Sequence, residues 1–62
     1  MQINWRIVAQ SAYESYAADT GNKNFRGEEM PEFAALPDKI RHAWIVAVRT
    51  AFEVSIKALL AK

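Results

Sequence analysis

The sequence of 62 residues contains no cysteine and only one histidine, His42. The lack of cysteine excludes disulfide bonds, and a single histidine leaves a structural metal site without its usual ligands. A domain of this size buries only about 60% of the surface that its unfolded chain exposes, so its core gives marginal stability. We therefore expect one domain, residues 1–62, that is completed by homo-oligomerisation.

The chain also lacks a long uncharged apolar run and a marked excess of one charge. No stretch approaches the roughly 18 apolar residues of a membrane-spanning helix, and the N-terminus does not have the pattern of a signal peptide. These features predict a cytoplasmic protein that does not act at a membrane. The net charge of +1 is too small for the basic surface of a protein held to DNA through phosphate contacts, which argues against nucleic acid as the partner.

Side-chain combinations that carry catalysis are missing as well. The serines and threonines have no histidine and acid that the chain can bring beside them. The acidic residues Glu28, Glu29 and Glu32 flank Pro31 and are typical of the start of a helix, whose amino-terminal end favours negative charge. We predict a protein that is not an enzyme and uses no cofactor or metal.

Hydrophobic residues make up 52% of the sequence, and they recur at helical spacing in two segments. The first runs from Asn4, a suitable N-cap, to about Asp19, with Gly21 suited to the left-handed position after the helix end. The face of this helix that we expect to be buried comprises Trp5, Val8, Ala9, Ala12, Tyr13 and Tyr16.

Two prolines organise the rest of the chain. Pro31 opens a short helical turn that closes at Leu36, and Pro37 opens a second long helix that continues almost to Lys62, with Asp38 in its first turn. The predicted fold is therefore all-α, a helix-loop-helix of two long helices with a short helical turn between them.

The second long helix is apolar over roughly 200° of its circumference, which is more than one neighbouring helix covers. It is also several turns longer than the first, so its C-terminal end has no expected neighbour within the chain. A second copy is the natural neighbour. The predicted oligomer interface consists of Trp44, Val48, Phe52, Ile56 and Leu59.

The loop from Thr20 to Pro31 has two interpretations. As a connector, its glycines make turns, its asparagines bond to nearby backbone, and Phe25 packs between the helices. As a site, its exposed amides and cations bind an anionic ligand or a partner. The candidate binding residues are Lys23, Asn24 and Arg26 in the loop, together with Tyr13, Tyr16, Arg41 and His42.

Some of these candidates have structural alternatives. The hydroxyls of Tyr13 and Tyr16 either hold the loop through its backbone or reach a ligand. His42 either assists Arg41 in binding an anion or is a surface residue near Asp38.

The segment AYESYAADTGNKNFRGEEMPEFAALPDKIRHAWIVAV, residues 12–48, resembles small helical proteins encoded by tailed phages and prophages. These contain an AYxxY helix, a GxxNFxGxxMP-like loop and an LPxxIxxAW helix in this order. The resemblance implies an accessory protein in the cytoplasm of a host cell. Such a protein counters host defence by binding a host macromolecule or by sequestering a signalling nucleotide, and helical homo-oligomers occur among them.

The resulting hypothesis is a non-enzymatic phage accessory protein that binds a host protein or an anionic, nucleotide-like ligand as a homo-oligomer. The alternative is a small DNA-binding or regulatory protein that uses its basic C-terminal helix. That alternative draws on Lys39, Arg41, Arg49 and Lys57, although Arg41 projects away from Lys39 and Lys57, so these residues form no continuous basic stripe.

Overall fold

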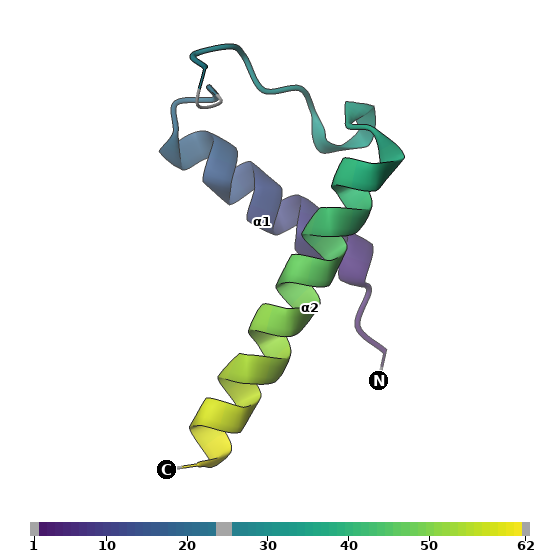
Figure 1. Ribbon diagram of the computed structural model, residues 1–62, viewed down its shortest axis with the longest axis vertical. Coiled ribbons are helices and arrows are strands. Elements are labelled where there is room, and N and C mark those ends of the chain that lie inside the picture. Colours follow the sequence, from purple (N-terminus) through teal and green to yellow (C-terminus); the bar gives the residue numbers. More distant parts are fainter. Residues whose placement is uncertain (1, 24–25, 62) are drawn as a thin grey trace.

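The computed structural model describes residues 2–23 and 26–61, and its two long helices cross each other (Figure 1). Helix α1 spans Trp5–Asp19, the short 3-10 helix η1 spans Phe33–Ala35, and α2 spans Asp38–Leu60. The described residues contain no β-strand, only an isolated antiparallel bridge between Lys23 and Glu29. The predicted all-α helix-loop-helix fold is confirmed.

Both ends of α1 are capped as the sequence predicts. The Asn4 side-chain oxygen accepts the backbone N–H groups of Arg6 at 3.1 Å and Ile7 at 3.2 Å, which would otherwise lack partners. At the other end Gly21 has φ +67° and Asn22 has φ 62°. Their N–H groups donate back to the carbonyls of Ala18 and Ala17, and this pattern of bonds closes a helix with a left-handed turn.

We had predicted that each proline occupies the first position of its helix, but both lie just before the helices that they precede. Pro37 caps α2 with φ −57° and ψ 148°, so its ring fixes φ while the backbone remains extended. Its carbonyl accepts the N–H groups of Ile40 and Arg41, both at 3.0 Å. Asp38 lies in the first turn, as predicted, and α2 ends at Leu60.

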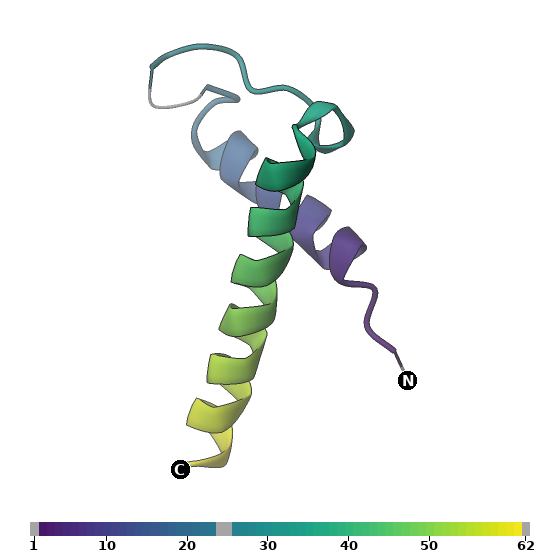
Figure 2. The same ribbon diagram turned by 45° about the vertical axis from the view of Figure 1, so that its right-hand side comes forward.

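The core is small and lies between α1, η1 and the first half of α2. Its buried members among the described residues are Ala9, Tyr13, Ala17, Phe33 and Leu36. Helix α2 has no buried residue and contributes the partly buried Trp44, Ile45 and Val48. Two residues of the predicted buried face of α1, Val8 and Tyr16, are 37% and 45% exposed, because α2 crosses α1 and does not run along it (Figures 1 and 2).

Helix α2 continues well beyond its crossing with α1, and this gives the molecule extents of 41 × 22 × 17 Å (Figure 1). Phe52 contacts the Trp5 ring edge-on, with 5.4 Å between ring centroids. All residues from 53 to 61 are exposed. No helix among the described residues has the length and apolar character needed to cross a membrane.

Candidate binding surfaces

The connector between α1 and η1 closes on itself before it returns to α1. The Met30 N–H donates to the Asn22 carbonyl at 3.0 Å, directly beside the bridge between Lys23 and Glu29. The Thr20 hydroxyl donates to carbonyls of the last turn of α1 and lies 3.7 Å from the Met30 sulfur. Lys23 and residues 26–29 therefore belong to a lobe whose described ends are held together beside the end of α1.

Tyr13 fixes the point where the connector returns. Its hydroxyl donates to the Pro31 carbonyl at 2.6 Å, and its ring packs against Phe33 and Trp44 at centroid distances of 5.8 and 5.4 Å. Burial raises the pKa of the Tyr13 phenol above its ordinary value because the charged phenolate would lose hydration. Of the two roles weighed for this residue, the structure shows the one in which Tyr13 holds the loop backbone.

Tyr16 lies one turn further along α1 and differs from Tyr13. Its ring contacts Trp44 at a centroid distance of 5.7 Å, and 45% of the residue is exposed. Trp44 therefore packs against two tyrosines of its own chain. Two residues of the predicted oligomer interface, Trp44 and the partly buried Val48, therefore pack against other parts of the same chain.

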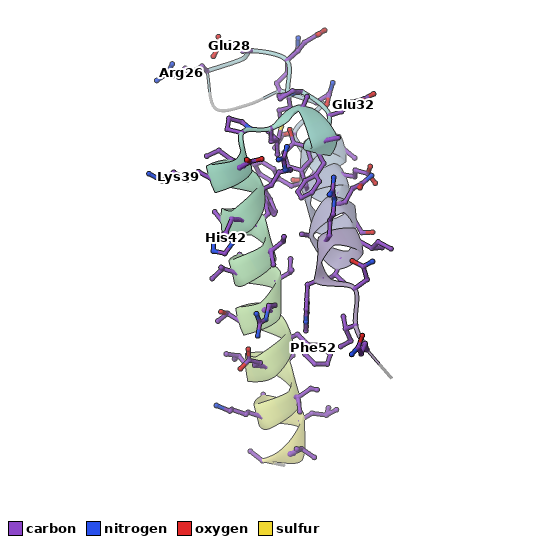
Figure 3. All side chains as sticks on the ribbon, turned by 90° about the vertical axis from the view of Figure 1, so that its right-hand side faces the viewer. Arg26, Glu28, Glu32, Lys39, His42 and Phe52 are labelled. Carbon is purple, nitrogen blue, oxygen red and sulfur yellow. The ribbon has the colours of Figure 1, made fainter. Side chains whose placement is uncertain are left out.

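The loop cations predicted to bind an anion lie on the projecting lobe. Lys23 and Arg26 are exposed, and Figure 3 places Arg26 at the far end of the molecule from α2's C-terminus. Asn24 and Phe25 lie outside the described residues, and with them the expected seam contact of Phe25. Anion binding by this loop therefore stays a prediction.

Arg41 has a structural role that the sequence did not reveal. Its guanidinium donates to the carbonyls of Ala34 at 2.9 Å and Leu36 at 2.6 Å, and it pairs with the Asp38 carboxylate. Asp38 thus pairs with Arg41, while His42 is exposed on the side of α2 that carries Lys39 (Figure 3). These intrachain contacts engage both terminal nitrogens of the Arg41 guanidinium.

A groove of about 550 Å³ lies between α1 and the returning connector, and the sequence interpretation missed it. One wall follows a stripe of α1 at helical spacing, and the other is the segment Met30–Ala34. The residues that line it are Gln10, Tyr13, Glu14, Ala17, Ala18, Asn22, Met30, Pro31, Glu32, Phe33 and Ala34. The spacing of the α1 residues was readable in the sequence, but the chain segment that faces them was not.

An exposed apolar surface lies on the C-terminal half of α2. Phe52 and Ile56 are 42% and 41% exposed, Val54 is 59% exposed, and Leu59 and Leu60 are 69% and 79% exposed. Of the predicted interface residues, Phe52, Ile56 and Leu59 belong to this surface. We call Phe52, Ile56 and Leu59, which share one side of the helix at 100° per residue, the distal face of α2, and Val54 and Leu60 project outside it.

No cluster of three potential metal ligands occurs within residues 2–23 and 26–61. Comparison of the chain with models of known protein families, with characterised proteins and with solved structures found no match.

Proposed function

We propose that the protein is a non-catalytic binding protein whose working form is a homo-oligomer assembled through the distal face of α2. The observation that carries the proposal is the exposure of five large apolar side chains on one half of one helix. Exposed apolar surface of this kind is typical of protein interfaces, because burying it removes it from water.

The total surface of the chain supports the same conclusion. A folded monomer of 7.0 kDa is expected to expose about 4,000 Å². This chain exposes 5152 Å². The excess is comparable to the roughly 800 Å² that each partner buries in a standard interface.

The shape of the chain agrees with this comparison. Its radius of gyration is 13.4 Å. A compact domain of this length is expected to have a radius of about 10.6 Å. The difference comes from α2, whose distal half extends away from the core (Figure 2).

The composition of α2 favours another copy over an anionic partner. The exposed polar residues of its distal half include both Glu53 and Lys57, so the net charge beside the distal face is close to neutral. A membrane-surface helix or a DNA-binding helix needs a cationic polar face. Self-association also supplies the buried surface that a core of five buried residues lacks.

The resemblance to phage-encoded proteins gives this proposal its biological setting. We propose that the oligomer binds a host macromolecule and thereby counters host defence. The projecting lobe with Lys23 and Arg26 is the surface that we assign to that contact, since loops on a rigid helical scaffold often carry recognition.

The experiment that tests the proposed assembly is native mass spectrometry of the purified protein, combined with sedimentation equilibrium across the micromolar range. We expect one discrete oligomer whose helicity and mass decrease together on dilution, because folding and association are coupled. A well-folded monomer at every concentration would contradict the proposal.

A further inference from the structure

The groove beside α1 is formed by contacts within the chain. The Tyr13 hydroxyl bond to the Pro31 carbonyl fixes its second wall, and the Asn22 to Met30 backbone bond fixes the end nearest the lobe. Small side chains at Ala17 and Ala18 leave the space open on the α1 side. Its volume of about 550 Å³ lies within the roughly 300 to 1,000 Å³ range of small-molecule sites.

The charge of the groove has one sign. Glu14 on α1 and Glu32 on the connector contribute carboxylates, and none of the described lining residues is lysine or arginine. The Gln10 side-chain amide donates to one oxygen of Glu14 at 3.1 Å, which positions that carboxylate. Glu32 extends from the connector on the side of the molecule that carries α1 (Figure 3). An anionic ligand would meet two like charges here.

The remaining lining residues are largely apolar. Tyr13 and Phe33 are buried and form the base of the groove, and Met30, Pro31 and the alanines form its sides. Apolar walls with a few polar groups are typical of sites for small organic ligands. Carboxylates near aromatic rings favour cations in particular, because both attract positive charge.

We propose that this groove binds a small organic cation, an ammonium or guanidinium group carried on a short apolar or aromatic body. The charged group lies between the carboxylates of Glu14 and Glu32, and the apolar body packs on the side chains below them. This inference goes beyond the proposed assembly. The groove is lined by α1, Asn22 and the segment Met30–Ala34, whereas the distal face belongs to the C-terminal half of α2. That half extends away from the connector (Figures 1 and 2).

The test uses three ligands of one shape and different charge, namely phenethylammonium, 2-phenylethanol and 3-phenylpropionate. Backbone amide shifts of the isotope-labelled protein are followed during each titration at fixed protein concentration. We expect saturable shifts at Gln10, Ala18 and Asn22 with phenethylammonium, at least about fivefold weaker binding of 2-phenylethanol, and no binding of 3-phenylpropionate. Preference for the anion or equal affinity for the neutral compound would overturn the proposal.

Two variants and a matched control test whether the carboxylates of Glu14 and Glu32 hold the cationic group of the ligand. The double variant Glu14→Gln, Glu32→Gln keeps the shape of the groove and is expected to lower phenethylammonium affinity at least about fivefold without changing that of 2-phenylethanol. Glu53→Gln makes the same chemical change on α2 and is expected to leave binding unchanged. Ala18→Leu fills the groove from the solvent side and is expected to abolish binding of both ligands.

The outcomes separate this proposal from competing occupants. Unchanged phenethylammonium binding in the double variant would show that the carboxylates do not hold the cation, and the inference would fail. Groove amides that shift with protein concentration alone would show that a second copy occupies the site, which also overturns it. Either result leaves the assembly through the distal face to be judged by its own measurement of mass.

Discussion

At the scale of single residues, Tyr13 joins three parts of the molecule. It extends from α1, its ring contacts Phe33 in η1 and Trp44 in α2, and its hydroxyl donates to the Pro31 carbonyl. From the sequence alone, two roles remained open for its hydroxyl, namely a bond that anchors the loop and a contact with a ligand. Periodicity placed it on the buried face of its helix, but the partner of its hydroxyl depends on how a segment 18 residues away returns.

Removing the hydroxyl alone measures this anchor. We expect Tyr13→Phe to lower the free energy of unfolding by about 1 kcal/mol, because the Pro31 carbonyl loses its donor while the ring contacts remain. Tyr16→Phe is the matched control, since the Tyr16 side chain is nearly half exposed. Urea denaturation at one fixed protein concentration gives both values. Equal stability of the two variants would contradict the role assigned to Tyr13.

The raised pKa of Tyr13 predicts a dependence of stability on alkaline pH. The unfolded chain loses this proton near pH 10, whereas the folded chain keeps it to higher pH, so stability is complete below pH 10 and decreases as pH rises above it. One proton gives a slope of at most about 1.4 kcal/mol per pH unit. The measurement is the difference in unfolding free energy between the natural chain and Tyr13→Phe from pH 8 to pH 11. A difference that does not change above pH 10 would argue against burial of an ionisable phenol.

At the scale of elements, the parts of the fold set by local sequence could be predicted. Asn4 and Gly21 cap α1 as expected, and apolar spacing located both long helices, because these features depend on neighbouring residues. The groove could not be predicted, since it exists only where Met30–Ala34 returns beside α1. The intrachain contacts of Trp44 with Tyr13 and Tyr16 could not be predicted for the same reason, because they depend on how the two helices cross.

Arg41 provides a test of how η1 is attached to α2. We expect Arg41→Ala to destabilise the protein by about 2 kcal/mol, because the carbonyls of Ala34 and Leu36 lose a charged donor and Asp38 loses its partner. Lys39→Ala removes an exposed cation from the same helical turn and is expected to change stability by less than about 0.5 kcal/mol. Thermal denaturation of both variants at one concentration makes the comparison. Similar melting temperatures would show that the guanidinium contacts contribute little in solution.

At the scale of the whole molecule, the small size of the core and the exposure of the distal face are related. Five buried residues among those described give a chain of this length little stability of its own, and α2 leaves the apolar side chains of its distal face exposed. Helix propensity alone does not explain a distal half in which residues 53 to 61 are all exposed, because most helical stability in proteins comes from burial of an apolar face. The proposed assembly would bury the apolar side chains of the distal face and so supply this stability.

Substitutions on the distal face test this connection between assembly and folding. We expect Ile56→Asp and Leu59→Asp each to dissociate the oligomer and to reduce helicity strongly, because a charge would be buried at the interface without a partner. Thr50→Asp places the same side chain on the polar side of α2 and is expected to keep both the mass and the helicity. Sedimentation and circular dichroism measure the two properties on the same samples. If both distal variants keep the parent mass and helicity, the distal half of α2 is a solvent-exposed extension, and the oligomer, if one forms, uses another surface.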